Sequence, residues 1–163
     1  MTKDPLRPAD DEARGIAQGL LGAARFGALG VLHPESGVPF VSRIALGLDE
    51  AGGLISLISG IAQHTHALQK TPTCSLLVGE PGARGDPLTH ARLTVQANAI
   101  IVPHASIEFA GLRAHYLLTH PKAKLYIDFA DFMFARFRVT EAFLNGGFGF
   151  ACVLTADDLE MRP

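Results

Sequence analysis

The sequence has 163 residues, of which 48% are hydrophobic and 18% charged, and its formal net charge is −2. This composition excludes an intrinsically disordered chain, and the lack of excess positive charge argues against a nucleic-acid-binding surface. A chain of this length can form one domain with a substantial hydrophobic core. We therefore expect a single domain over residues 1–163, with residues 1–9 as a flexible tail.

The N-terminal segment and the cysteines bear on the cellular location of the protein. Residues 1–12 are polar and acidic and lack the apolar stretch of a signal peptide. No segment approaches the roughly 20 consecutive apolar residues of a membrane span. Cys74 and Cys152 lie in separate apolar runs and form neither a disulfide framework nor a zinc site. We expect a soluble, cytoplasmic protein.

The first third of the chain predicts one helix followed by strands. Apolar residues recur at intervals of three and four over residues 10–25, which predicts an amphipathic helix with an acidic first turn. Short turns then separate strand-like segments at residues 26–32, 38–46 and 54–59, so antiparallel pairing is expected. A polar helix is predicted over residues 62–71, before a proline.

The remaining chain continues the β pattern. We expect a helix at residues 105–119 and strands at residues 73–78, 91–102, 133–144 and 148–154. Six or seven antiparallel strands interrupted by short helices indicate a mainly β, α+β fold. They favour a closed barrel over a doubly wound parallel sheet, because the early connections are too short for crossovers.

The junction between strand 54–59 and the following helix has the composition of a phosphate-binding pocket. A glycine delivers the chain to a helix start, where backbone N–H groups lack intrahelical partners and Gln63, His64 and Thr65 add polar side chains. Arg43, on the preceding strand, offers a guanidinium group that suits a phosphate monoester. The same pattern also fits an ordinary hairpin followed by a surface helix.

The histidines and serines are weaker candidates for chemistry. His64 and His66 would point to different faces of a helix, His115 and His120 are five residues apart, and no metal site is predicted from them. Haem needs only one axial histidine, so each of these four remains a candidate ligand. The sequence contains no Gly-x-Ser-x-Gly motif, which disfavours covalent hydrolysis.

A glycine-rich segment lies near the end of the chain. Residues 145–150 read Asn-Gly-Gly-Phe-Gly-Phe, and their glycines could let a flat ligand approach the main chain between Phe148 and Phe150. The glycines could equally form a bulge that bends a strand. No helix follows, so the segment is not a dinucleotide-binding fingerprint.

Taken together, these elements resemble the FMN-binding split β-barrel of the pyridoxamine 5′-phosphate oxidase-like superfamily, from about residue 13 to residue 159. The similar stretches are residues 39–46, 57–65 and 92–96. Within the superfamily, the haem-utilisation branch looks most similar, on the basis of residues 61–68, 120–126, 131–137 and 146–149.

The resemblance implies a homodimer with FMN at the subunit interface and a flavin-dependent redox reaction. It assigns no catalytic residue, substrate or electron donor. By position, it assigns Arg43 to the FMN phosphate, Gln63, His64 and Thr65 to further phosphate contacts, and Ser59 and Arg92 to the ribityl chain or the flavin ring. An uncharged Gln63–His64 pair stands where the oxidases proper have an Arg-Lys pair.

Two departures from the superfamily limit these expectations. The chain has no tryptophan, so the Trp and Arg that close the substrate site of true pyridoxamine-phosphate oxidases have no counterpart, and vitamin B6 oxidation is not expected. Haem-degrading relatives carry a ligating histidine on a C-terminal extension, and no histidine follows His120 here. Haem binding on the same barrel is the alternative function, and a barrel that has lost its cofactor site is a third.

Overall fold

The computed structural model describes residues 6–161, which form eight strands, three α-helices and two 3₁₀ helices. The strands are β1 (Phe26–Leu32), β2 (Pro39–Ala45), β3 (Gly47–Leu48), β4 (Leu54–Ser59), β5 (Thr73–Val78), β6 (Arg92–Val102), β7 (Phe132–Gly147) and β8 (Phe150–Thr155). The helices are α1 (Asp11–Ala23), α2 (Gln63–Lys70), α3 (Ile107–Thr119), η1 (Pro87–Thr89) and η2 (Pro121–Leu125). The predicted mainly antiparallel fold is confirmed, with one strand more than expected, because the predicted strand 38–46 continues beyond Leu46 as β3.

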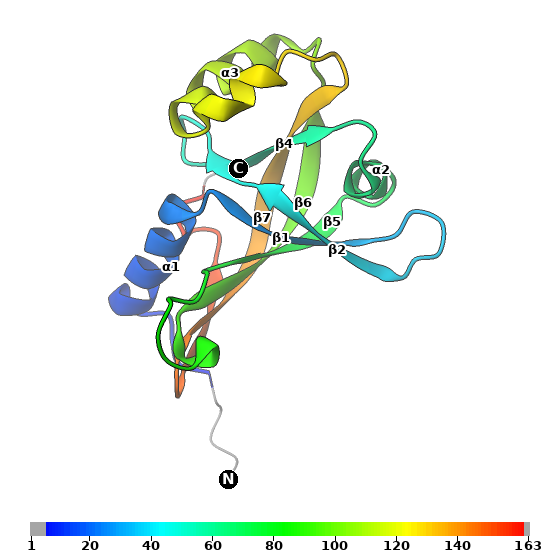
Figure 1. Cartoon of the computed structure of the whole chain (residues 1–163). Coiled ribbons are helices and arrows are strands. Elements are labelled where there is room, and N and C mark those ends of the chain that lie inside the picture. Colours follow the sequence, from blue (N-terminus) through cyan, green and yellow to red (C-terminus); the bar gives the residue numbers. More distant parts are fainter. Residues whose placement is uncertain (1–5, 162–163) are drawn as a thin grey trace.

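The eight strands form one sheet in the order β2-β1-β5-β6-β7-β4-β3, with β8 paired to β7 (Figure 1). Main-chain pairing does not close this sheet, although the sequence predicted a closed barrel, because β2 and β3 lie at its two edges. These edges are consecutive in the chain and separated only by Leu46. Ser56 of β4 donates a hydrogen bond from Oγ to the carbonyl of Ala45 at the end of β2, at 2.6 Å. The bent segment from β2 to β3 therefore holds the two edges of a split barrel together.

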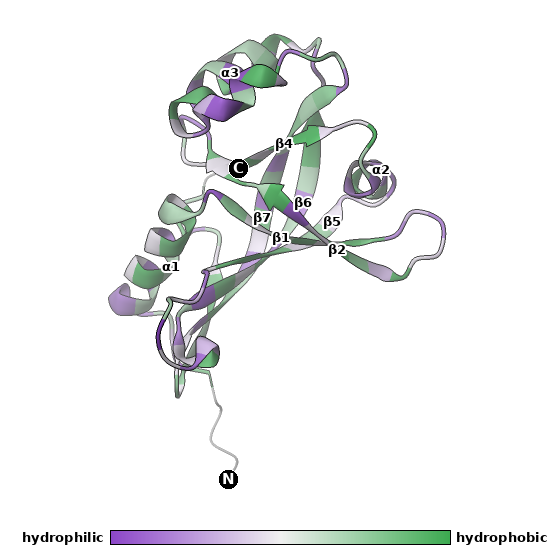
Figure 2. Ribbon diagram, viewed as in Figure 1, coloured by the Kyte–Doolittle hydropathy of each residue, from purple (hydrophilic) through white to green (hydrophobic). Residues whose placement is uncertain are grey.

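The inner face of the sheet carries the main hydrophobic core. Side chains alternate between faces along a strand, and the inward positions of β1 and β6, such as Leu29 and Val95, are fully buried. Helices α1 and α2 pack their apolar stripes against this core and leave their polar sides to solvent (Figure 2). Burial of the inner face explains why apolar residues recur at every second position of these strands in the sequence.

A second, smaller core lies on the outer face beneath α3. It contains Ile55 and Leu57 of β4, Phe134 of β7, and Phe109 and Tyr116 of α3. Because α3 covers only this end of the outer face, the outer face over β2, β1 and β5 lacks such a cover (Figure 1).

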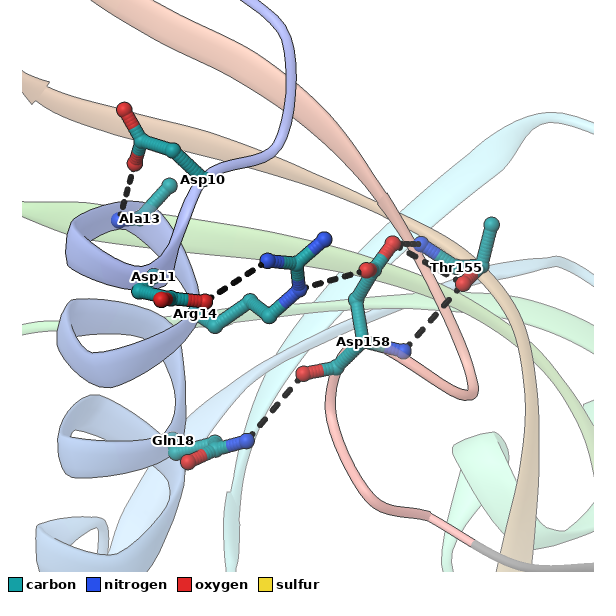
Figure 3. A network of polar contacts seen from close by, with 7 residues as sticks. All are labelled: Asp10, Asp11, Ala13, Arg14, Gln18, Thr155 and Asp158. Atoms are coloured by element: carbon teal, nitrogen blue, oxygen red, sulfur yellow. Dashed lines mark hydrogen bonds and ion pairs between the residues drawn. The ribbon is translucent and has the colours of Figure 1, made fainter.

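A polar network joins α1 to the turn that follows β8 (Figure 3). Arg14 donates from Nε to Asp158 Oδ1 at 2.8 Å, and Gln18 donates to the Asp158 carbonyl oxygen at 3.1 Å. The other carboxylate oxygen of Asp158 accepts hydrogen bonds from the backbone N–H and the hydroxyl group of Thr155, at 2.8 and 2.9 Å. These four residues, Arg14, Gln18, Thr155 and Asp158, are called the α1 latch below.

The N-terminal segment was predicted to be a flexible tail over residues 1–9. Residues 1–5 lie outside the described residues. Arg7 donates its backbone N–H to the Ala151 carbonyl of β8 at 2.7 Å, and its guanidinium group lies 5.1 Å from the centre of the Phe150 ring. Within residues 6–161, no helix combines the length and apolar character needed to cross a membrane.

Candidate functional site

The bare part of the outer sheet face contains a groove of about 430 Å³. One row of paired residues crosses it, from Val41 of β2 through Gly30 of β1 and Ser75 of β5 to Gln96 of β6. The floor is shallow because Gly30 and Ser75 have small or no side chains. This groove, the outer-face groove, is open to solvent and mostly apolar.

Arg43 lies on the same outer face, two residues along β2 from Val41. Its side chain is exposed, and its guanidinium carbon lies 5.5 Å from the centre of the Phe26 ring, which places the cation over an aromatic face. The guanidinium is therefore available to an anionic group that approaches the outer face.

His64 lies on the other side of β2. Its Nδ1 is 3.0 Å from Oγ of Ser42, and Ser42 points to the inner face because it is adjacent to Arg43 in the strand. Burial lowers the pKa of His64 below its ordinary value, so the ring is neutral at physiological pH. A neutral ring on the inner side of β2 supplies no positive charge to an anion bound at Arg43.

Side chains at the start of α2 and at the end of β4 form hydrogen bonds within the chain. Thr65 is fully buried, and its hydroxyl donates to the carbonyl oxygen of Ser59 at 2.6 Å. Ser59 in turn donates from Oγ to Asp131 at 2.7 Å, and His66 places Nε2 2.8 Å from the Gly60 carbonyl oxygen. Gln63, the first residue of the helix, is exposed. Of the predicted phosphate contacts at this helix, Gln63 has the side chain most open to solvent.

Arg92 occupies the first position of β6, at the end opposite Val102. Its guanidinium donates to the carbonyl oxygen of Leu88 at 3.0 Å and that of His90 at 3.4 Å, in the loop before the strand. Val102 and Leu57 pair with the same residue of β7, Phe134, so Ser59 lies beyond the Val102 end of β6, at the opposite end of that strand from Arg92.

The six predicted site residues thus form two groups within one chain. Ser59, Gln63, His64 and Thr65 gather where β4 meets α2. Arg43 and Arg92 share the outer face, three strands apart. The two groups approach each other at β2, where His64 contacts Ser42, the residue next to Arg43.

The structure adds two residues that the predicted site lacked. Ser42 contacts His64 and Asp131 contacts Ser59. The alternation of side chains along a strand could have placed Ser42 opposite Arg43. No local pattern could have paired Ser59 with Asp131, because the two are 72 residues apart in the sequence.

The glycine-rich segment forms the hairpin between β7 and β8. The pairing register shifts between Asn145 and Gly147, as in a bulge. Gly147 has φ of 119°, and a Cβ atom there would lie 2.9 Å from the carbonyl oxygen of Thr89, so the hairpin packs closely on η1. Phe148 at the tip is 99% exposed. The structure supports the bulge interpretation of this segment.

A family model of the CREG beta-barrel matches residues 8–160. The chain belongs to the CREG beta-barrel family. The chain is similar to the chloroplastic non-canonical heme oxygenase HOZ of Arabidopsis thaliana. The two proteins are 35% identical over 121 residues, which are 68% of this chain and 36% of HOZ. The chain therefore spans 36% of the length of this curated relative.

Solved structures with a similar fold include heme-binding and oxidase-family proteins. A heme-binding protein from Mycobacterium smegmatis is 30% identical and superposes with a TM-score of 0.80, over 95% of this chain and 61% of that chain. A Clostridium acetobutylicum protein of the pyridoxinephosphate oxidase family superposes with a TM-score of 0.66 at 15% identity, over 92% and 99% of the two chains. These comparisons confirm the predicted resemblance to oxidase-like split barrels and to the haem-utilisation branch.

Proposed function

We propose that this protein binds haem as a homodimer, with the cofactor held against the outer-face groove between the two copies. The observation that carries the proposal is the bare, apolar outer face with an exposed cation on it, Arg43, which has no ion pair within residues 6–161. Six large apolar side chains on this face are exposed, namely Phe26, Leu32, Val41, Leu77, Ile100 and Phe143. A patch of this kind usually marks a binding surface, and a two-fold axis would let the same patch of a second copy cover it.

The groove suits the ring and the acid groups of haem. The floor at Gly30 and Ser75 leaves room for a flat ring, and Arg43 offers a guanidinium group to a propionate. The groove-lining residues include no histidine. The proposal therefore assigns ring and propionate contacts to this face, and an axial ligand to a histidine elsewhere on either copy. Two relatives at 30% and 35% identity carry haem in their names, which supports this choice.

An FMN-dependent oxidoreductase is the second candidate, and the position of Arg43 favours it. An exposed guanidinium beside an aromatic ring would suit the FMN phosphate as well as a propionate. The side chains at the start of α2 offer less support, because Thr65 and His64 are already engaged within the chain. Gln63 is still exposed for a phosphate contact, and Arg92 lies on the same outer face as Arg43.

Parallel absorbance titrations of the purified protein with haem and with FMN test the cofactor. We expect a saturable Soret shift with haem, and an Arg43→Gln variant should weaken haem binding by about tenfold through loss of a charge-assisted contact. Arg84→Gln, in the exposed loop before η1, is the matched control. Saturation by FMN alone would establish the second candidate, and binding of neither ligand would reject both.

The oligomeric state is tested separately by sedimentation. We expect a dimer that Val41→Glu converts to a monomer, because the substitution would place a carboxylate in the apolar interface. Ile107→Glu is the control, since Ile107 on α3 is exposed but lies outside the bare face. A Val41→Glu protein that stays dimeric would contradict the proposed interface.

A further inference from the structure

One edge of β7 lacks a neighbouring strand over three residues. β4 pairs with β7 as far as Phe137, and β8 begins to pair at Glu141, so residues 138–140 have no strand partner on this side. Two hollows of about 260 and 320 Å³ open on either side of this gap, and both are lined by Gly53, Phe137 and Arg138. The first hollow faces outward beside Arg136, and it is called the β7 recess below.

Arg136 lines the β7 recess with a guanidinium group that is incompletely hydrogen-bonded. Its Nη1 donates to Glu108 Oε2 of α3 at 2.6 Å. Its Nε has no hydrogen-bond partner among residues 6–161, since the carboxylate oxygen of its ion-pair partner Asp49 lies 3.7 Å away, beyond hydrogen-bonding distance. Because Nε itself is buried, a ligand in the recess would reach Arg136 through the exposed part of its side chain, which is 38% exposed overall.

Arg138 adds an uncommitted cation to the same recess. It lies two residues from Arg136 and therefore faces the same side of the sheet. Its side chain is exposed and makes no hydrogen bond or ion pair with residues 6–161. The guanidinium group is thus free to bind an anion.

The acidic groups around the recess are already engaged or face the other hollow. Asp49 accepts hydrogen bonds at Oδ1 from the backbone N–H groups of Ala51 and Gly53, at 3.0 and 2.7 Å. Glu108 is bonded to the far side of Arg136, and Asp157 lines the second hollow. Asp49, the one acidic residue that lines the β7 recess, and Glu108 both form ion pairs with Arg136, so Arg138 is left there without an acidic partner within residues 6–161, which favours an anion beside it.

We propose that the β7 recess binds a carboxylate or phosphate oxyanion between the guanidinium groups of Arg136 and Arg138. Leu54, Ile100 and Phe137 form an apolar wall, so a ligand with an apolar body next to its acid group fits the recess. Arg138 is paired across the sheet with Asn98, which lines the outer-face groove. The oxyanion is therefore either the acid arm of a cofactor in that groove, which rests on the proposed function, or a free anion.

Nuclear magnetic resonance of the ¹⁵N-labelled full chain without haem tests the recess directly. Titration with inorganic phosphate at constant ionic strength, with chloride as the reference salt, should shift the amide signals of residues 136–140 and 49–53 in a saturable way. Arg138→Gln should abolish these shifts, Arg138→Lys should weaken binding several-fold, and Arg84→Gln should leave binding unchanged. An absent or linear response, or equal affinity in Arg138→Gln, would overturn the inference.

A haem titration of the same variants then identifies the source of the oxyanion. If it is a propionate, Arg138→Gln should weaken haem binding about five- to tenfold, and phosphate should compete with haem in the unmodified protein. If it is a free anion, haem affinity should be the same in Arg138→Gln and independent of phosphate. A protein that binds phosphate at these residues but no haem would refute the proposed function and keep this inference.

Discussion

The α1 latch and the β7 recess both combine arginines with carboxylates, but they differ in how completely the arginine donors are hydrogen-bonded. In the α1 latch, Arg14 bonds both Asp158 and Asp11, and Asp158 also accepts two hydrogen bonds from Thr155 (Figure 3). In the β7 recess, the buried Nε of Arg136 has no hydrogen-bond partner and Arg138 has no ion pair within residues 6–161. Both clusters combine arginine and acidic residues, but only the β7 recess has a buried arginine N–H donor without a hydrogen-bond partner among residues 6–161.

This difference separates a structural role from a binding role. A satisfied cluster connects two chain segments and has no capacity for another group. A cluster with free donors beside a hollow is stabilised when a ligand oxygen binds there and accepts a hydrogen bond. The latch should therefore affect stability, and the recess should affect ligand affinity.

The largest expected effect comes from the apolar anchor of the latched turn. Leu159 follows Asp158 and is only 4% exposed within the main core. Leu159→Ala should lower the free energy of unfolding by about 3 kcal/mol, and the melting temperature by roughly 10 °C, through the cavity it leaves. Calorimetry measures this, with the exposed Leu88→Ala as control. Equal losses in the two variants would show that the turn contributes no core packing.

Removing the polar part of the latch should have a smaller effect. Asp158→Ala leaves the backbone N–H of Thr155 and Nε of Arg14 without their shared acceptor. We expect the melting temperature to fall by roughly 5 °C and amide exchange in α1 to accelerate. Asp157→Ala, at the exposed neighbouring position, is the control. Unchanged exchange in α1 would mean that the latch does not hold this helix.

The contribution of Asp158 should depend on pH. The backbone N–H of Thr155, together with Arg14 and the Thr155 hydroxyl, holds the pKa of Asp158 below its ordinary value. Folding therefore favours the ionised carboxylate. The stability advantage over Asp158→Asn should be complete above the unfolded pKa of about 3.9 and should shrink as pH falls through the folded pKa. Urea unfolding at a series of acidic pH values measures the difference, and a pH-independent difference would contradict this assignment.

The smallest expected effect on stability is that of the β7 recess. Arg138→Ala should change the melting temperature by less than about 1 °C in phosphate-free buffer, because the side chain is exposed and makes no described ion pair. Differential scanning calorimetry provides the comparison with Asp158→Ala. A fall as large as that of the latch variant would show that Arg138 is structural.

Most of the secondary structure could be predicted from the sequence. A polar helix was predicted over residues 62–71, before Pro72, and the structure has α2 at Gln63–Lys70, because the end of a helix at a proline is a local signal. The open arrangement of the sheet could not be predicted in this way. It depends on the pairing of β4 with β7, whose paired residues Ser59 and Phe132 are far apart in the sequence.

The candidate site was less accessible to sequence reasoning. Arg43 could be placed on a strand face by alternation, but the burial of His64 against Ser42 arises from how α2 packs on the inner core. The β7 recess was not predicted at all. Its existence depends on where β4 ends and β8 begins along β7, which is a property of register and not of local composition.

The position of β7 in the sheet also bears on how the protein is made. β7 pairs with β6, β4 and β8, yet it begins only at Phe132, late in the chain. During synthesis from the N-terminus, the long edges of β4 and β6 therefore stay unpaired until β7 leaves the ribosome. Such edges can pair with other chains, and non-local pairing of this kind folds slowly. Until β7 is synthesised, nascent chains of this protein therefore expose two strand edges that the folded sheet covers.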